Sequence, residues 1–415
     1  MVILGIDLGD KNSCISKIIN TNNEIISNSQ SKRTTPTMLS FNGKYYAGEN
    51  VNNLWISNYK YSFSNFKKIM NLFTNNDETF GNNIIKRENN TILFKINEEE
   101  FISVEQIVAF YLEHLIKMNK INLENVEIVI SVPCYYNETQ RLVLYNAAKM
   151  IGIKISCLVS DYLATAINYS IFNFAKNLYK EQEIINIIDL GAYNLCFSNI
   201  TLHEKNLKVN NVNYMKNFGG NSIDEYLVKY FSELIKKDYD IDIKNYNKGY
   251  NKLYNSCEKM KKDFSINNLG NLNIECFYED LDINYTIDRD KYLEIVSELD
   301  NKLIDFLNNN CLEYKQFKTL IVGCGNRIFN FSKIISDFFG KNLSKQSNLE
   351  ESTARGCGYI AAMLTENSLL KPINLQDIIT DSIDIVVQNS KINKILFDKG
   401  FNYPKKKTNG NKKKN

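Results

Sequence analysis

Two stretches of sequence decide the fold: ILGIDLGDKNSC at residues 3–14 and INIIDLGAYNLCFS at residues 185–198. Each places an apolar, strand-like run directly before Asp-Leu-Gly, first at Asp7 and again at Asp189. Solenoid repeats recur at periods of up to roughly 50 residues, and these two copies lie much farther apart. The sequence therefore predicts a duplicated half-molecule, with one copy of the motif in each half.

The chemistry of the motif points to a phosphate-containing ligand. A buried strand that ends in Asp-Leu-Gly places a carboxylate at the mouth of a sheet, and the glycine lets backbone N–H groups approach a phosphate closely. Two such loops facing one another would bracket the phosphates of a nucleotide, with Asp7 and Asp189 holding Mg²⁺ through water molecules. Asp-x-Gly is also common in ordinary turns, so it is the matching flanks of the two copies that favour a ligand site.

Composition restricts the class of protein. The chain has 415 residues, enough for two or three domains, and its net charge of +3 is too small to indicate nucleic-acid binding by the whole chain. Nine cysteines contain no Cys-x-x-Cys pair, and His114 and His203 are too few to complete a zinc site. No signal peptide and no apolar run of about 18 residues is readable. These features predict a soluble cytoplasmic protein with reduced thiols, a nuclear location also being compatible, and no specific nucleic-acid or membrane partner.

Strand-like and helical patterns alternate along the chain. Residues 126–133 form a short β-branched run ended by Pro, as buried strands do. Residues 104–118 and 137–152 carry apolar side chains at steps of three and four, and Gly152 is placed to end the second helix. This alternation predicts an α/β fold, with a small polar peripheral lobe at residues 72–100.

Seven segments occur in the order seen in the heat-shock protein 70 superfamily: GIDLGDKNSC, KRTTPTMLSF, NFKKIMNL, SVPCYYNETQRLVLYNAAKMIGI, FGGNSIDEYLVKYF, SCEKMKKDFS and VGCGNRIFNFSKIISDFFGK. The chain resembles this superfamily over about residues 1–370. Details such as CEKMKKDFS, NIECFYEDLDINYTIDRDKYLEI and ARGCG are most similar to its heat-shock protein 110, or Sse-type, cochaperone branch. The resemblance implies an actin-like ATP-binding domain of two lobes, about residues 1–176 and 177–366, each a βββαβα unit. It explains the duplicated motif as one phosphate loop per lobe.

The resemblance also implies catalytic and metal-binding groups. Lys67 matches the lysine that reaches the γ-phosphate and the attacking water, and Asp161 stands where many relatives have a glutamate near the metal. Together with Asp189 these residues would form the catalytic set. Asp7 and Asp189 would hold Mg²⁺ through water.

Binding of ATP or ADP is implied for three further regions, which are the phosphate loops, a helix N-terminus and an adenosine pocket. The N–H groups of that helix would face the nucleotide, and the guanidinium of Arg327 would stack on adenine. Read alone, residues 258–262 look like a solvated helix face, and the context favours ligand contact. The implied nucleotide contacts are Asp7, Gly9, Asp10, Lys11, Asp189, Gly191, Gly219, Gly220, Glu258, Lys261, Lys262, Ser265, Gly323 and Arg327.

Three positions depart from the family pattern. Residues 9–11 read Gly-Asp-Lys where hydrolysing relatives have Gly-Thr-Thr. A carboxylate about 4 Å from a phosphate charge costs up to ~4 kcal/mol at an effective dielectric near 20. The charge of Lys11 would offset part of this cost. Residues 192–194 read Ala-Tyr-Asn in place of Gly-Gly-Thr, so the second loop closes less tightly. Cys324 replaces a glycine beside the adenosine. These changes predict ATP binding with at most weak hydrolysis, and neutral drift is the alternative.

The end of the chain departs further. Residues 371–404 resemble the linker and the first two strands of the family's substrate-binding β-domain. About 35 residues cannot encode a complete β-sandwich. We therefore expect a C-terminally truncated member of the superfamily that does not bind peptide clients. Residues 405–415 form a basic run without apolar residues, which predicts a disordered, solvated tail, with contact to RNA or an acidic partner as the alternative.

The function implied by the resemblance is that of an ATP-binding, stress-response chaperone-family protein that acts as nucleotide-exchange cochaperone for a conventional heat-shock protein 70. One alternative is an enzyme, either a hydrolysing chaperone ATPase or a small-molecule kinase of the same fold. For the kinase, no motif supplies a carboxylate base beyond Asp161. The other alternative is a degenerate pseudo-chaperone without exchange activity.

Overall fold

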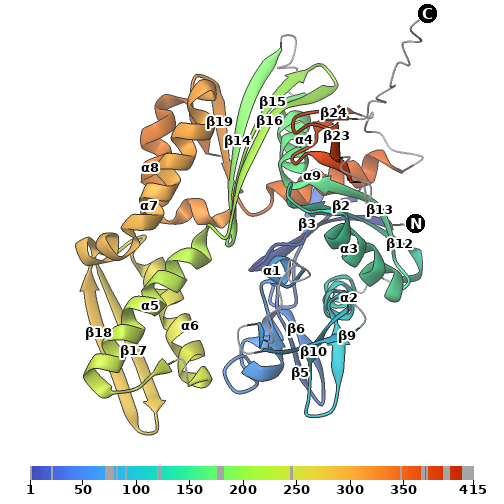
Figure 1. The fold of residues 1–415 in the computed structure, drawn as a ribbon. Helices are drawn as coiled ribbons and strands as arrows, with labels where there is room; N and C mark the ends of the chain where they lie inside the picture. The colour runs from blue at the N-terminus through green and yellow to red at the C-terminus, as the bar shows by residue number, and fades with distance from the viewer. Residues whose placement is uncertain are drawn as a thin grey trace, which may run out of the picture.

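The chain forms two lobes, residues 2–174 (the first lobe) and 182–365 (the second lobe), which stand beside one another (Figure 1). The computed structural model describes residues 2–19, 22–70, 79–80, 83–88, 91–118, 121, 123–174, 182–243, 246–345, 348–365, 370, 373–386 and 393–403. The predicted basic tail, residues 405–415, lies outside this set.

The first lobe is built on a mixed sheet. Its strands are β1 (Val2–Asp7), β2 (Asn12–Ile19), β3 (Asn22–Ile26), β4 (Thr35–Pro36), β12 (Val126–Val132) and β13 (Lys154–Ser160). The order is β13–β12–β1–β2–β3, with β4 paired to β2. β1 runs parallel to β12, and the register pairs Asp7 with Ser131. Asp7 therefore ends its strand at the carboxyl edge of the sheet.

The second lobe repeats this arrangement. Its corresponding strands are β14 (Glu183–Leu190), β15 (Asn194–His203), β16 (Asn206–Lys216), β19 (Lys318–Val322) and β20 (Leu343–Lys345). Their order is β20–β19–β14–β15–β16, with the same parallel and antiparallel pairings as in the first lobe. Asp189 pairs with Val322 at the carboxyl edge, as Asp7 does with Ser131. The predicted α/β, actin-like duplication is confirmed.

Helices pack on these sheets, and the longest are amphipathic. They are α1 (Phe66–Met70), α2 (Val104–Lys117), α3 (Glu138–Met150), α4 (Asp161–Phe174), α5 (Gly220–Tyr239), α6 (Asn247–Asp263), α7 (Arg289–Cys311), α8 (Phe329–Phe339) and α9 (Ser352–Met363). The helix predicted at 137–152 is confirmed as α3. It begins at a capping box between Asn137 and Gln140, and Gly152 follows its end with a φ of +74°. Among the described residues, every helix is too short or too polar to span a membrane.

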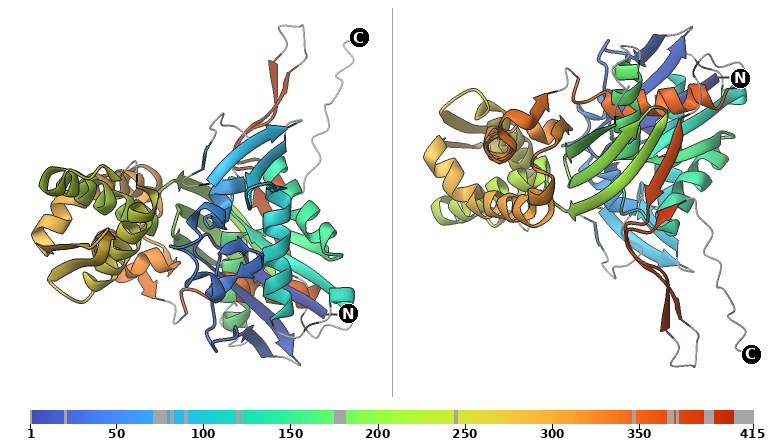
Figure 2. Two further views of the ribbon diagram at one scale, coloured as in Figure 1. Left: turned by 90° about the horizontal axis from the view of Figure 1, so that it is seen from below. Right: turned by 90° about the horizontal axis from the view of Figure 1, so that it is seen from above.

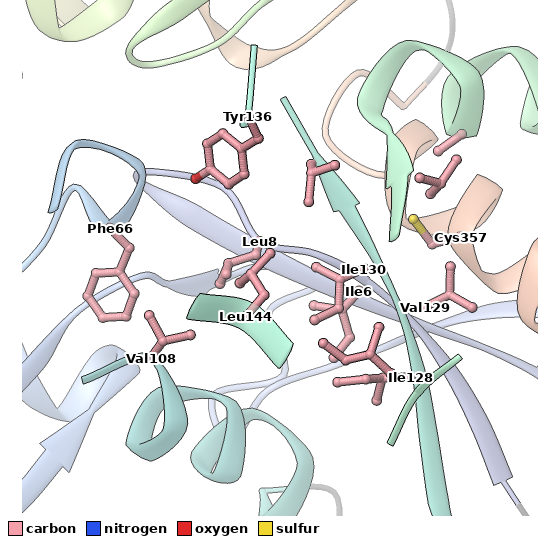
Figure 3. Close-up of a cluster of buried hydrophobic side chains, with 14 of the residues drawn as sticks. Ile6, Leu8, Phe66, Val108, Ile128, Val129, Ile130, Tyr136, Leu144 and Cys357 are labelled. Carbon is pink, nitrogen blue, oxygen red and sulfur yellow. The ribbon is translucent and has the colours of Figure 1, made fainter. Parts of the chain in front are cut away.

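The core of the first lobe explains the apolar runs of its strands. Ile128, Val129 and Ile130 are consecutive and fully buried, because the parallel part of the sheet is covered on both faces. Figure 3 shows them clustered with Leu144 of α3 and Cys357 of α9. A residue from the second lobe thus belongs to the core of the first.

The final helices of the two lobes join them. α4 packs along α9, and α9 also packs on β1 and β2 of the first lobe. Gly356 lies so close to the carbonyl of Ala164 that a Cβ would overlap it. The Thr165 and Thr353 hydroxyls lie 3.1 Å apart and share a hydrogen bond. This close contact holds the two lobes together on the side away from their outer ends.

Smaller sheets extend the outer ends of the lobes. In the first lobe they are β5 (Leu39–Asn42), β6 (Lys44–Ala47) and β7 (Ser62–Phe63), and β8 (Thr79–Phe80), β9 (Asn83–Glu88), β10 (Thr91–Lys95) and β11 (Phe101–Ser103). In the second lobe β17 (Leu269–Tyr278) pairs with β18 (Leu281–Asp288). The predicted peripheral lobe at 72–100 contains β8, β9 and β10, and parts of it lie outside the described residues.

The C-terminal segment docks on both lobes. β21 (Asn374–Ile378) extends the second sheet beside β16, and β24 (Asn402–Tyr403) pairs with β21. Asp377 accepts hydrogen bonds from the hydroxyls of Tyr162, at 2.6 Å, and Tyr403, at 2.8 Å. The hairpin of β22 (Ile383–Val386) and β23 (Asn393–Phe397), dark red in Figure 2, projects from the body. The predicted linker thus includes a strand of the second sheet.

Candidate functional site

A pocket lies between the lobes, at the carboxyl edges of both sheets. The loop after β1 forms one wall and the loop after β14 forms the other. The predicted site residues that line it are Asp7, Gly9, Asp10, Lys11, Lys67, Asp161, Asp189, Gly191 and Gly323. The duplication therefore brings the predicted phosphate and metal contacts of the two halves into one place.

Five carboxylates line this pocket and give it an excess of negative charge: Asp7, Asp10, Asp161, Asp189 and Glu350. Asp161, at the start of α4, is buried, and Asp7 and Asp189 are partly buried at the ends of their strands. Burial, together with the charge of Asp161, raises the pKa of Asp7 to about 6 and that of Asp189 to about 7. The Ser131 hydroxyl donates to Asp7 Oδ1 at 2.9 Å, whereas Asp161 Oδ1 is buried without a hydrogen-bond partner. Such a set of acids favours a bound cation.

Lys67 supplies a positive charge beside these acids. Its Nζ lies 3.7 Å from Asp161 Oδ2, and both side chains are largely buried. Burial lowers the pKa of Lys67, but the carboxylates of Asp161 and Asp10 raise it more, so that the net shift is upward. The ammonium therefore remains charged, and it does not by itself balance the carboxylates of the pocket.

The donor set fits a hydrated Mg²⁺. Within the part of the chain that the structure describes, no group of three or more His, Cys, Asp or Glu side chains is arranged to hold a metal ion directly. Mg²⁺ commonly keeps several waters and binds through one or two carboxylates and the phosphates of a nucleotide. The water-mediated role predicted for Asp7 and Asp189 is of this kind, and the orphaned oxygen of Asp161 offers a further acceptor for such water.

Asp10 has a local partner that the sequence analysis did not foresee. Its Oδ1 accepts the backbone N–H of Lys67, at 2.9 Å, at the start of α1. Burial raises the pKa of Asp10, and the nearby Lys67 opposes that shift. The sequence predicted a carboxylate that mainly repels phosphate, whereas this carboxylate also fixes the turn that carries Lys67.

Lys11 lines the pocket and reaches the second lobe beside it. Its Nζ lies 2.8 Å from Glu258 Oε2 on α6, and it also lies over the ring of Tyr254, 5.4 Å from the centroid. Lys262 binds the other oxygen of Glu258 at 2.8 Å. Burial tends to raise the pKa of Glu258, but the two lysines outweigh it and hold that pKa at about 2. The predicted offset of the Asp10 charge is thus shared with an interlobe ion pair.

The first N–H groups of α5 bind carbonyl groups of the second loop, and nucleotide contact by Gly219 and Gly220 stays a prediction. The N–H of Gly220 donates to Gly191 O at 3.1 Å, and the N–H of Asn221 donates to Ala192 O at 2.8 Å. A Cβ on Gly219 would lie 2.6 Å from Gly191 O. The helix therefore binds the second loop itself.

The residues predicted around adenosine fall mostly outside the pocket lining. Lys261 is buried and donates to Asp224 Oδ2 at 2.6 Å and to Gly220 O at 2.9 Å, and Ser265 is exposed. Arg327 forms an ion pair with Glu350, so its guanidinium already has a partner. The predicted residues that do not line the pocket are Gly219, Gly220, Glu258, Lys261, Lys262, Ser265 and Arg327.

Gly323 does line the pocket, and its backbone explains why glycine stands there. Its φ is +84°, a left-handed conformation that other residues rarely adopt, and a Cβ would lie 2.7 Å from Asp189 Oδ1. The following residue, Cys324, also lines the pocket, and its thiol donates to Glu350 Oε1 at 3.1 Å.

Several lining residues were missed by the sequence analysis. They are Asn12, Cys14, Thr34, Leu349, Glu350 and Thr353. The duplication contained a signal for Glu350. Asp161 lies at the start of α4, which follows β13, and Glu350 lies just before the equivalent helix α9, which follows β20. The others carry no pattern of their own and reach the pocket only through the fold.

Comparisons with known proteins show the family of this chain. Residues 3–411 match the Hsp70 protein family. The chain is 27% identical over 394 residues to an Sse-type heat shock protein homolog of Saccharomyces cerevisiae, a match covering 90% of this chain and 57% of that protein. A heat shock protein homolog of Lachancea kluyveri, also of the Sse type, matches to the same extent. The chain thus spans little more than half the length of these relatives. Because the family match covers nearly the whole chain and the fold is the duplicated one, the chain belongs to the Hsp70 family.

Proposed function

We propose that the chain binds ATP with Mg²⁺ in the interlobe pocket and acts as a nucleotide-exchange cochaperone for a conventional Hsp70 chaperone in the cytoplasm. The observation that carries the first part is the acidic set of Asp7, Asp161 and Asp189 beside Lys67. The pKa values of Asp7 and Asp189 are raised, and one oxygen of Asp161 is buried without a hydrogen-bond partner. Mg²⁺, when bound, neutralises phosphate charge. Asp7 and Asp189 hold its waters, and Lys67 stands ready for the terminal phosphate.

Binding is tested by thermal unfolding of the full chain with and without MgATP. Ligand at about 100 times its dissociation constant stabilises a protein by ~2.7 kcal/mol, so the melting temperature should rise. The Asp189→Asn variant, which loses a carboxylate of the metal site, is the control and should show little shift. If folded parent protein shows no shift at millimolar MgATP, the binding proposal is wrong.

Slow turnover is part of the proposal. Hydrolysis needs donors aimed at the charge that develops on the phosphates, and here several polar groups of the loops are bound within the protein. Asp10 holds the N–H of Lys67, Lys11 pairs with Glu258, and the first N–H groups of α5 bind the second loop. These contacts support binding without efficient turnover.

The alternative, a hydrolysing chaperone ATPase, is favoured by the Lys67–Asp161 pair that remains in the pocket. Steady-state phosphate release decides between the two. A rate comparable to that of an ordinary Hsp70, abolished in Lys67→Ala, would support the ATPase and contradict slow turnover.

Exchange activity is supported by the resemblance to the Sse-type branch, together with a pocket suited to hold nucleotide more than to consume it. A protein that binds the open, low-affinity state of its partner shifts the partner toward release of ADP. Stopped-flow release of a fluorescent ADP analogue from a partner Hsp70 measures this directly. The parent protein, added at a saturating concentration together with ATP, should speed the release of the analogue. The Asp189→Asn variant should speed that release less. An unchanged rate with parent protein would instead support a pseudo-chaperone without exchange activity.

A further inference from the structure

Asp10 places a buried carboxylate in the first phosphate loop. It follows β1, lines the interlobe pocket and is 5% exposed. Its Oδ1 accepts the backbone N–H of Lys67 at 2.9 Å. The start of α1 therefore holds this carboxylate at a fixed place in the pocket wall.

The ammonium of Lys67 is already surrounded by negative charge. Its Nζ lies 3.7 Å from Asp161 Oδ2, and the carboxylates of Asp161 and Asp10 are the main groups that raise the pKa of Lys67. The side chain of Lys67 is the one expected to reach the terminal phosphate of a bound nucleotide. That phosphate would have to share the ammonium with both carboxylates. Lys67 therefore attracts a terminal phosphate less than an unpaired lysine would.

Acidic groups of the pocket outnumber its basic ones. Among the described residues that line it, five are acidic, and Lys11 and Lys67 are the basic ones. Lys11 pairs with Glu258 and Glu350 pairs with Arg327, and both partners lie outside the lining. Bound Mg²⁺ adds two positive charges, and the other groups of the lining still leave a net negative charge. Each additional phosphate charge therefore enters a pocket that opposes it.

We propose that the charge of Asp10 makes the pocket select a nucleoside diphosphate over the corresponding triphosphate. ATP has one more negative charge than ADP, and that charge belongs to the terminal phosphate, beside Lys67 and hence beside Asp10. ADP lacks this phosphate and avoids the repulsion. The proposal rests on the proposed function and adds a preference to it: MgATP binds, but more weakly than MgADP, so that the chain holds ADP when both are present at equal concentrations.

The expected selectivity is about tenfold, which corresponds to ~1.4 kcal/mol and lies within the range for two unit charges several ångströms apart in a partly shielded pocket. Isothermal titration calorimetry of the full chain with MgADP and with MgATP measures both dissociation constants. Chromatography at the end of each titration shows that the ATP is still intact. The dissociation constant for MgATP should be about ten times that for MgADP.

Asp10→Asn tests the charge alone, because the amide oxygen can still accept the N–H of Lys67. In this variant MgATP should bind about tenfold tighter and MgADP about as in the parent, so the two dissociation constants become similar. Glu350→Gln is the matched control. It also removes a carboxylate from the pocket lining, but one that is paired with Arg327, and the ratio of its two dissociation constants should stay near that of the parent.

Asp10→Ala separates the charge from the turn that Asp10 holds. This variant loses the hydrogen bond to Lys67 as well as the charge. If the turn sets the selectivity, Asp10→Ala will change the ratio and Asp10→Asn will not, and the proposal is overturned. Thermal unfolding without nucleotide confirms that each variant is folded, and the ratio measured on the parent needs no variant.

The outcomes also separate this proposal from the proposed function. If the parent binds MgATP as tightly as MgADP, or if Asp10→Asn and Glu350→Gln give the same ratio, the selectivity proposal is overturned while nucleotide binding stands. If the folded parent binds neither nucleotide, the proposed function itself is wrong, and the selectivity falls with it. A tenfold preference for MgADP that disappears in Asp10→Asn alone establishes the assignment.

Discussion

Replacing Asp189 by Asn removes a partly buried carboxylate at the pocket wall, whose charge Lys67 offsets only in part. Burial and the charge of Asp161 raise the pKa of Asp189 to about 7. The folded protein therefore keeps a proton on Asp189 between about pH 4 and pH 7, whereas the unfolded chain has already lost it. In the absence of Mg²⁺, this group makes the free energy of unfolding fall as the pH rises through that window.

The magnitude follows from the pKa difference. Each unit by which the folded-state pKa exceeds the unfolded value corresponds to about 1.4 kcal/mol, so ionising Asp189 in the folded protein costs up to about 4 kcal/mol at pH 8. At pH 5 only about 2 kcal/mol of this is expressed, because the folded group is still protonated. Asp189→Asn also loses stability if its new amide group lacks a hydrogen-bond partner. This loss is the same at both pH values, so it cancels when the stability difference at pH 8 is compared with that at pH 5. The variant should gain about 2 kcal/mol on the parent between pH 5 and pH 8.

Urea unfolding of both proteins at pH 5 and pH 8, with a chelator and no nucleotide, measures this difference. Asp280→Asn is the control, because Asp280 lies exposed between β17 and β18, and it should show the same stability relative to the parent at both pH values. Addition of MgATP should raise the free energy of unfolding of the parent more at pH 8 than at pH 5. The same addition should raise that of Asp189→Asn little at either pH. A stability difference between Asp189→Asn and the parent that is the same at both pH values would refute the reasoning.

Three further predictions test individual contacts. Lys67→Ala removes the ammonium beside the pocket carboxylates, so any residual phosphate release should fall to the buffer rate. Gly323→Ala should lower the free energy of unfolding by about 1–3 kcal/mol more than Gly340→Ala, because both have positive φ but only Gly323 has neighbours within reach of a Cβ; equal losses in urea would contradict the packing argument. Tyr162→Phe deletes the 2.6 Å hydrogen bond to Asp377 and should cost about 1–3 kcal/mol, with faster proteolysis of the C-terminal segment as the direct readout; unchanged proteolysis would show that this contact does not hold it.

The sequence by itself determined the duplication, the α/β alternation and the family. Two Asp-Leu-Gly motifs after apolar runs predicted two equivalent sheets, and Asp7 and Asp189 do end equivalent strands. The end of α3 was also readable, because Gly152 adopts a positive φ there. Such features depend on a few consecutive residues or on a repeated pattern, so they are written locally in the chain.

Only the tertiary structure decided which partner each polar group takes. Asp10 binds the backbone of Lys67, the first N–H groups of α5 bind the second loop, and Arg327 pairs with Glu350. Lys11, expected to offset a charge in its own loop, reaches Glu258 on the opposite lobe. A charged or polar side chain binds whatever oppositely charged or hydrogen-bonding group the fold places within about 3 Å. That neighbour comes from segments far away in the chain, so spacing along the sequence contains no record of it.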